Sequence, residues 1–164
     1  MLSAFELVNR EWPSTKLILS HTGMHPSEQD MLIDRIRKSK STEAIKIASF
    51  VTDISEIINR ANVVVLPFRT VVGYSQPPLT VLEALAHGRP VITTSVGCLS
   101  EIIRDRINGF CIPPRDPQLL AESMLRMREV DLDFMSRNAR EYILRNHNWR
   151  KISESTIKVY NEIL

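Results

Sequence analysis

One carboxylate, Glu83, lies early in an apolar run that follows the prolines at positions 77 and 78. Prolines have no main-chain N–H group, so the first free amides of a helix beginning there belong to residues 79–81. Together with the helix dipole, such amides form a binding site for an anion. The stretch therefore predicts an anion site close to a carboxylate.

The spacing of residues 78–87 predicts a helix whose apolar stripe faces a sheet and consists of Leu79, Leu82, Leu85 and Ala86. Thr80, Glu83 and His87 fall together along one edge of that stripe. A partly buried carboxylate needs a partner, and ribose hydroxyls could serve as one. The alternative is an ion pair between Glu83 and His87, which would contribute about 0.2–0.5 kcal/mol and have no function.

Hydrophobic periodicity predicts alternating strands and helices around this stretch. Strands are expected near residues 16–20, 44–51, 62–67, 90–94 and 110–112, with helices between them and two more after residue 133. The unbroken apolar run 63–66 is typical of a central parallel strand covered on both faces. We expect an α/β fold with an open, doubly wound parallel sheet. Ligands of such sheets bind beyond the carboxyl ends of the strands, which selects the loops after Ser20, Val51, Leu66 and Thr94.

Composition excludes several classes of protein. The 164 residues suffice for one domain, and 21 Lys+Arg against 19 Asp+Glu give a net charge of +2, unlike a nucleic-acid-binding protein. The longest apolar run, residues 63–66, is too short to span a bilayer. The start of the chain lacks the features of a secretion signal, and Cys98 and Cys111 are expected to be reduced thiols. We therefore expect a cytoplasmic protein with at most peripheral membrane contact, through the basic stretch 35–40.

Residues 78–116 carry an ordered series of short motifs. They are Leu79-Thr80-Val81-Leu82-Glu83-Ala84-Leu85-Ala86, Gly88-x-Pro90-Val91-Ile92, Val96-Gly97, Glu101-Ile102-Ile103, Asn108-Gly109-Phe110 and Pro113-Pro114-Arg115-Asp116. The series resembles the donor-binding domain of retaining GT-B glycosyltransferases of glycosyltransferase family 4 (glycosyl transferases group 1). Weaker similarity extends over the whole chain.

This resemblance implies a Rossmann-like domain over residues 1–164, the C-terminal lobe of a GT-B fold lacking its first strand and therefore N-terminally incomplete. Residues 131–164 would form C-terminal helices that pack on it. The implied reaction transfers a sugar, as in hexosyltransferases, from a nucleotide-diphosphate sugar to an acceptor with retention at the anomeric carbon. It needs no metal and no cofactor.

The resemblance also assigns roles to residues of the donor site. Glu83, which matches the second Glu of the family's paired-Glu motif, would hold the ribose. The amides of Leu79 and Thr80 would bind the diphosphate and stabilise the leaving group as charge develops. Thr52 and Asp53 would line the base, and Gly23 would border the donor site.

The sequence departs from the family at the residues expected to contact the sugar. Ser75 stands where the family has its first Glu, so it and Gln76 could hydrogen-bond the sugar without supplying a carboxylate. Cys98 replaces a frequent second Gly. Arg10 and Lys16 do not lie where the family's diphosphate-neutralising Arg and Lys would be. The expected partners are a nucleotide-sugar and an acceptor-binding lobe or subunit, or a second copy associating through the open sheet edge.

Three other interpretations remain open. A non-catalytic nucleotide or nucleotide-sugar binding module would share the same fold. A phosphoacceptor signalling domain would use Asp53, but it would also need an acidic pair after the first strand, where the chain has His-Thr-Gly at residues 21–23. Asp131-Leu132-Asp133 matches a metal-binding Asp-x-Asp pattern, although its place between helices favours a helix cap.

Overall fold

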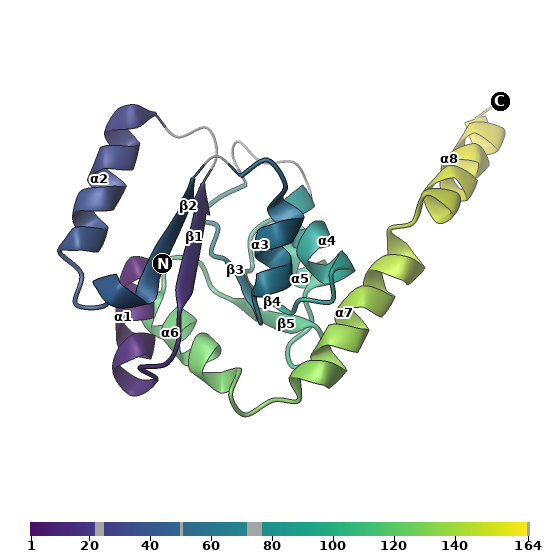
Figure 1. Ribbon diagram of the computed structural model, residues 1–164. Helices are drawn as coiled ribbons and strands as arrows, with labels where there is room; N and C mark the ends of the chain where they lie inside the picture. Colours follow the sequence, from purple (N-terminus) through teal and green to yellow (C-terminus); the bar gives the residue numbers. More distant parts are fainter. Residues whose placement is uncertain (22–24, 50, 72–76, 164) are drawn as a thin grey trace.

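The computed structural model describes residues 1–21, 25–49, 51–71 and 77–163. Helices and strands alternate along the chain, as predicted (Figure 1). In chain order they are α1 (Leu2–Glu11), β1 (Leu17–His21), α2 (Pro26–Arg37), the 3-10 helix η1 (Thr42–Ala44), β2 (Ile45–Ser49), α3 (Ile54–Arg60), β3 (Val64–Leu66), α4 (Leu79–Ala86), β4 (Val91–Thr94), α5 (Leu99–Ile102), β5 (Gly109–Ile112), α6 (Pro117–Arg126), α7 (Leu132–Asn146) and α8 (Trp149–Ile163).

The strands form two parallel sheets, one with the order β1-β2 and one with the order β3-β4-β5. In the first sheet Leu17 is opposite Ile45, and in the second Val91 is opposite both Val64 and Gly109. Helices flank the strands, as expected for parallel strands joined by crossover connections. The predicted parallel α/β fold is confirmed.

Strands β3 and β4 differ in burial. All four residues of β4 are buried, whereas all three residues of β3 are only half-buried. The prediction that residues 63–66 are covered on both faces is confirmed, because Val65 packs in one core cluster and Val64 in another, but β3 lies at the edge of its sheet in the described part of the chain and not at the centre. The difference in burial has a topological reason: β4 has a neighbour on each edge, while β3 pairs only with β4 in the described part of the chain.

Helix α1 connects the two sheets through two adjacent parts of its buried surface. Its residues Ala4 and Val8 pack in a core cluster that includes Ile92 and Phe110 of the larger sheet. Its residue Phe5 packs in a separate cluster around β1 and β2. The apolar positions of α1 thus hold the two sheets in one domain.

Aspartates cap three helices. Asp53, Asp116 and Asp131 accept hydrogen bonds from the backbone amides of Ser55 (2.8 Å), Leu119 (2.9 Å) and Phe134 (2.9 Å), at the starts of α3, α6 and α7. Such caps satisfy amides that have no partner within the helix. Asp131 is therefore a helix cap in this structure, which agrees with the interpretation of its Asp-x-Asp pattern as a cap.

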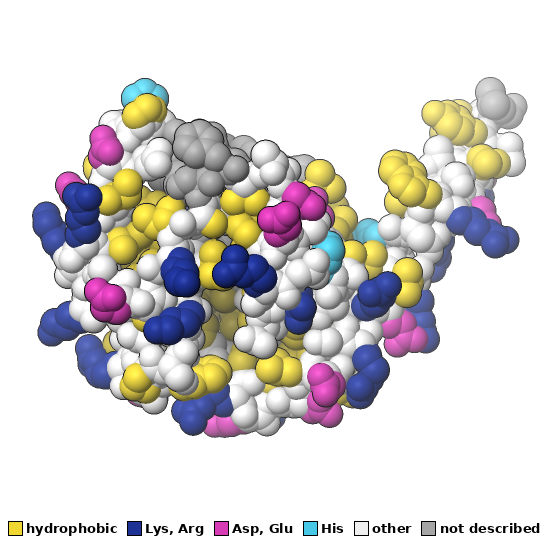
Figure 2. Space-filling view, in the orientation of Figure 1, with side chains coloured by type: hydrophobic (Ala, Val, Ile, Leu, Met, Phe, Trp, Pro, Cys, Tyr) yellow, Lys and Arg dark blue, Asp and Glu magenta, His cyan; other side chains and the backbone are white. Residues whose placement is uncertain are grey.

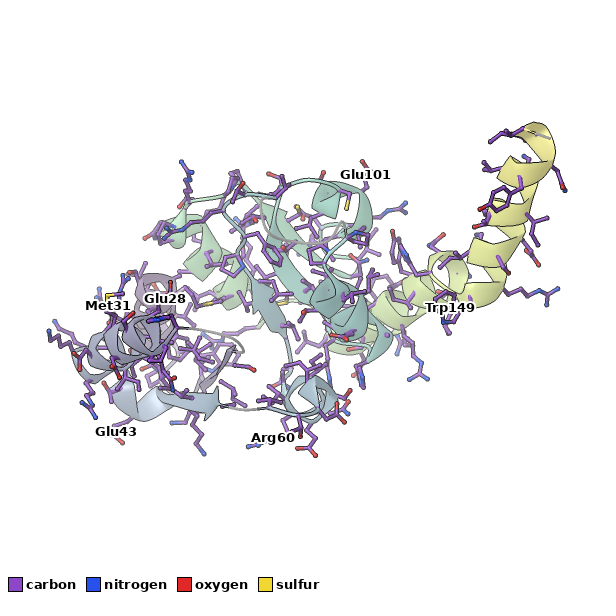
Figure 3. All side chains as sticks on the ribbon, turned by 90° about the horizontal axis from the view of Figure 1, so that it is seen from above. Glu28, Met31, Glu43, Arg60, Glu101 and Trp149 are labelled. Carbon is purple, nitrogen blue, oxygen red and sulfur yellow. The ribbon has the colours of Figure 1, made fainter. Side chains whose placement is uncertain are left out.

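The last two helices behave differently. Helix α7 buries Met135 and Ala139 against the domain, whereas every described residue of α8 is exposed. Helix α8 projects away from the domain in Figure 1, and Figure 3 shows Trp149 at its start, on the side opposite α2. Helix α7 thus packs on the domain, whereas α8 is exposed along its described length. Of the helices described, none is both long and apolar enough to cross a membrane.

Candidate functional site

The carboxyl ends of β2 and β3 lead toward the starts of α3 and α4, which lie side by side (Figure 1). A ring nitrogen of His87, Nδ1, lies 3.0 Å from Asn59 Oδ1, and Arg89 Nη2 donates to the Asn59 carbonyl at 2.7 Å. These contacts fix the two helices against each other. Their starts, with Asp53 and Leu79, therefore lie along the same edge of the fold, where parallel α/β proteins bind ligands.

The start of α4 presents two free amides rather than the three predicted. Val81 already donates its amide to the Pro78 carbonyl at 3.0 Å. Among the described residues, none accepts a hydrogen bond from the amide of Leu79 or Thr80. Two donors at the positive end of a helix dipole can hold a negatively charged oxygen.

The side of α4 that faces the sheet is not the predicted one. Val81, Ala84 and Leu85 are buried, whereas Leu79 is 66% exposed and Ala86 is exposed. The helix is therefore rotated relative to the stripe expected from the sequence. Leu79 is the first residue of the helix and lies outside the buried stripe of Val81, Ala84 and Leu85.

Glu83 lies one turn into α4, and its side chain is exposed rather than partly buried as expected. The alternative pairing with His87 is not formed, because the His87 ring contacts Asn59 instead. In the described ranges, the Glu83 carboxylate makes no side-chain hydrogen bond or ion pair. It is free to accept hydrogen bonds from a ligand.

Asp53 caps the N-terminus of α3, and its side chain is exposed. Hydrogen bonds from the hydroxyl and the amide of Ser55 lower the pKa of Asp53, because they stabilise the ionised carboxylate. Thr52, which precedes it, is exposed. Both residues thus lie at the predicted edge, and one oxygen of Asp53 is committed to α3.

Three predicted site residues lie outside the described part of the chain. They are Gly23, Ser75 and Gln76. Their predicted roles at the border of the donor site and at the sugar stay predictions.

Two arginines lie near the start of α1, and sequence reasoning gave neither of them a role at the site. Arg35 of α2 and Arg69, which follows β3, both act electrostatically on the start of α1. Burial first, and then these two guanidinium groups, lower the pKa of the Met1 amino group. The signal for Arg69 was present in the sequence, because it is the first cation after the carboxyl end of a strand.

Thiols and metal ligands do not form a centre in the described residues. No group of three His, Cys, Asp or Glu side chains among them could hold a metal ion. Cys98 and Cys111 are not joined by a disulfide, and both are half-buried. Burial and the nearby Asp105 carboxylate raise the pKa of Cys111, which disfavours the reactive thiolate.

The parallel α/β fold, with a helix start open at its carboxyl edge, defines a domain of the Rossmann-like class. Residues 1–129 match the family model of the glycosyl transferases group 1, and the chain belongs to this family.

Individual relatives agree with this assignment. Glycogen synthase from Mycobacterium tuberculosis is 28% identical over 163 residues, which are 97% of this chain and 38% of that protein. The C-terminal domain of the group 1 glycosyl transferase LpcC from Francisella tularensis has a TM-score of 0.72 at 22% identity, over 90% of this chain and 77% of that one. TarM from S. aureus, in complex with fondaparinux, alpha-GlcNAc-glycerol and UDP, has a TM-score of 0.80 at 20% identity, over 98% of this chain and 32% of that one.

The fold is therefore that of the C-terminal lobe of GT-B glycosyltransferases, as the sequence predicted. The chain spans about two-fifths of the length of the curated relatives that it matches first.

Proposed function

We propose that this chain is the donor-binding domain of a retaining glycosyltransferase and binds a nucleotide-diphosphate sugar at the start of α4. The observation that carries this proposal is the pairing of two free amides, at Leu79 and Thr80, with the unpartnered Glu83 carboxylate one turn further on. Amides suit a diphosphate and a carboxylate suits hydroxyl groups, so together they match the two halves of a ribose diphosphate.

The diphosphate would receive hydrogen bonds from the amides of Leu79 and Thr80. Arg69 would add a positive charge from the loop after β3, near the start of α1. These groups would stabilise the negative charge that develops on the leaving diphosphate when the bond to the sugar breaks. The chain would thus supply leaving-group stabilisation from its own residues, without a metal or a cofactor.

The other parts of the donor would contact neighbouring loops. Glu83 would accept hydrogen bonds from the ribose hydroxyls, and the Thr52–Asp53 pair before α3 would contact the base. Ser75 and Gln76 would contact the sugar. Because Ser75 is neutral, the sugar would be held by hydrogen bonds there and not by a carboxylate.

Turnover would require an acceptor-binding lobe or subunit. The chain spans 38% of the M. tuberculosis glycogen synthase, and the TarM structure that shares its fold contains UDP. Both facts support a nucleotide-binding lobe that works with a second lobe. The alternative function is a non-catalytic nucleotide-sugar binding module, which Ser75 favours because the usual carboxylate is absent there.

The test of the site uses Glu83→Ala, with Glu101→Ala as a matched control on another exposed carboxylate, at α5 (Figure 3). Each variant is titrated by calorimetry with UDP-, GDP- and ADP-sugars. Hydrogen bonds to a charged group contribute about 1.5–3 kcal/mol, so Glu83→Ala should weaken binding about 10- to 100-fold. Glu101→Ala should bind like the parent. Equal binding by parent and Glu83→Ala would refute the role of Glu83.

A second variant tests the amides. Leu79→Pro removes one donor at the first helical position, where proline is tolerated and where the side chain is exposed. We expect unchanged helicity by circular dichroism and about tenfold weaker binding of the nucleoside diphosphate itself. Undiminished binding would contradict the diphosphate site. Sugar transfer by the chain alone would contradict the need for an acceptor lobe, and binding without transfer in the presence of such a lobe would favour the binding module.

A further inference from the structure

Most of the lysines of this chain lie at one place in the fold. Six of the 21 Lys+Arg residues are lysines, and four of these six are Lys16, Lys38, Lys40 and Lys46. Lys38 directly follows α2 and Lys40 comes two residues later, whereas Lys16 precedes β1 and Lys46 lies in β2. All four are exposed. We call these four residues the lysine cluster.

Two members of the lysine cluster lie on the same face of the sheet formed by β1 and β2. Lys46 is the register partner of Ile18 in these parallel strands. Lys16 is two residues before Ile18, and alternate residues of a strand point to the same face, so the side chains of Lys16 and Lys46 are neighbours. Leu17 and Ile45 point to the opposite face and pack with α1. The lysine pair thus lies on the face turned away from α1, outside the basic stretch 35–40.

A fixed turn brings the other two members to the same end of the sheet. The Thr42 hydroxyl donates to a carbonyl at the end of α2 at 2.6 Å, and the Ser39 hydroxyl donates to the Glu6 carboxylate of α1 at 2.5 Å. These bonds hold the turn that carries Lys38 and Lys40. The turn leads through η1 directly into β2, so both lysines lie near the amino end of that strand.

No carboxylate neutralises the lysine cluster in the described ranges. None of its four residues forms an ion pair there, and neither does the exposed Glu43 of η1, labelled in Figure 3. The remaining two lysines, both in α8, do have partners: Lys151 donates to the Arg145 carbonyl at 2.9 Å, and Lys158 pairs with Glu162 at 3.9 Å. Figure 2 shows Lys and Arg side chains predominating at the lower left, where α2 ends and β1 and β2 begin in Figure 1. The lysine cluster is therefore a positive surface.

The residue types favour a membrane surface over a protein partner. Lysine is a compact, hydrated charge on a flexible stem, whereas arginine makes the fixed bidentate bonds that recognise individual carboxylates and phosphates. Aromatic residues anchor protein interfaces, but the exposed Trp, Tyr and Phe side chains in the described ranges all lie in α7 and α8. A group of about four lysines or arginines is enough to attract a chain to anionic lipids. We propose that the lysine cluster binds the surface of a membrane that contains anionic lipids.

The proposed contact lies at the end of the sheet opposite the candidate donor site. Strand β2 begins beside the lysine cluster, and its carboxyl end leads to α3 and Asp53. The five residues of this strand extend about 16 Å, which exceeds the Debye length of about 8 Å at physiological ionic strength. The membrane contact would therefore leave the donor site open to the aqueous phase and would not depend on it.

Sedimentation of the chain with lipid vesicles tests the proposal. One set of vesicles is pure phosphatidylcholine, and the other contains about one quarter phosphatidylserine. The chain should bind only the second set, and binding should disappear when the salt is raised to about 1 M, because the Debye length falls to about 3 Å. Equal binding to both sets, or binding to neither, would overturn the proposal.

Double variants locate the contact. Lys38→Gln with Lys40→Gln, and Lys16→Gln with Lys46→Gln, each remove half of the lysine cluster. A lysine near an anionic membrane contributes about fivefold in affinity, so each double variant should bind the anionic vesicles about 25-fold more weakly than the parent. The matched control, Lys151→Gln with Lys158→Gln, changes the two exposed lysines of α8 and should bind like the parent. Because all of these side chains are exposed, circular dichroism should show the parent's helicity in every variant.

Two outcomes would assign the contact differently. If Trp149→Ala weakens vesicle binding and the variants of the lysine cluster do not, the membrane contact belongs to α8. If calorimetry shows that the parent binds polyglutamate more tightly than it binds the anionic vesicles, the lysine cluster recognises an acidic polypeptide. Either result overturns the proposal.

Discussion

The two halves of this molecule contain similarly apolar strands, yet only one half has a strand that is buried at every position. Strand β4, in the half formed by residues 64–146, is buried at every position, whereas the leucines and isoleucine of β1 are half-buried. The strands are comparably apolar, so composition does not explain the difference. Strand β4 has a partner on each edge and helices α5 and α6 packed on it, while β1 has one partner among the described strands. Burial is decided by the neighbours of a strand.

The largest expected effect tests this contrast directly. Ile92→Ala, in the centre of β4, should lower the free energy of unfolding by about 4 kcal/mol, because the side chain is fully buried and a cavity would remain. The matched change Ile18→Ala, on half-buried β1, should lower it by about 1 kcal/mol. Urea unfolding measures both values. Equal losses would mean that β1 is as tightly covered as β4.

The second expected effect concerns the close approach of β5 to β4. A Cβ atom on Gly109 would lie 1.9 Å from the Val91 carbonyl oxygen, so Gly109→Ala must push β5 away from β4. We expect a loss of about 3 kcal/mol in unfolding free energy. The control Ala48→Val, on half-buried β2, should change it by no more than about 0.5 kcal/mol. If Gly109→Ala leaves the unfolding free energy unchanged, β5 can move away from β4 at no cost in stability.

A smaller effect is expected in the pH dependence of folding stability, through Asp53 at the start of α3. Ser55 holds the pKa of Asp53 below its ordinary value of 3.8. Because the folded-state pKa is the lower one, Asp53 stabilises the fold at pH above 3.8, and this contribution disappears as the pH falls through the folded-state value. NMR titration should give a pKa below 3.8. Asp53→Asn should keep the cap and remove this acid-dependent loss, whereas a pKa of 3.8 or more in the parent would contradict the hydrogen bonds at α3.

Much of the fold was predictable from local pattern. The alternation of elements and the family followed from periodicity and from the motifs after residue 78, because each depends on neighbours in the sequence. The cover of residues 63–66 on both faces was predicted, but the edge position of β3 in the described sheet was not, since it depends on which strand lies beside it. The same limit applies to α4, where Leu79 was expected inside and is exposed because the helix turns Val81, Ala84 and Leu85 inward instead.

Part of the candidate site was also predictable. The helix start and Glu83 follow from prolines and spacing, and the structure places them at the expected edge. The contact between His87 and Asn59 could not be predicted, because 28 residues separate the partners along the chain. Arg69 could have been singled out as the first cation after β3, but its place near the start of α1 is known only from the fold.

The smallest expected effect extends the comparison to the last two helices. Trp149 is 86% exposed and Ile152 is 44% exposed on α8, whereas Met135 on α7 is completely buried. Ile152→Ala should therefore change the unfolding free energy by less than about 0.5 kcal/mol, because there is little packing to lose. The control Met135→Ala should lose about 2–5 kcal/mol. A loss above about 1 kcal/mol for Ile152→Ala would mean that α8 packs on the chain in solution, and burial of Trp149, seen as a blue shift of its fluorescence, would confirm that contact.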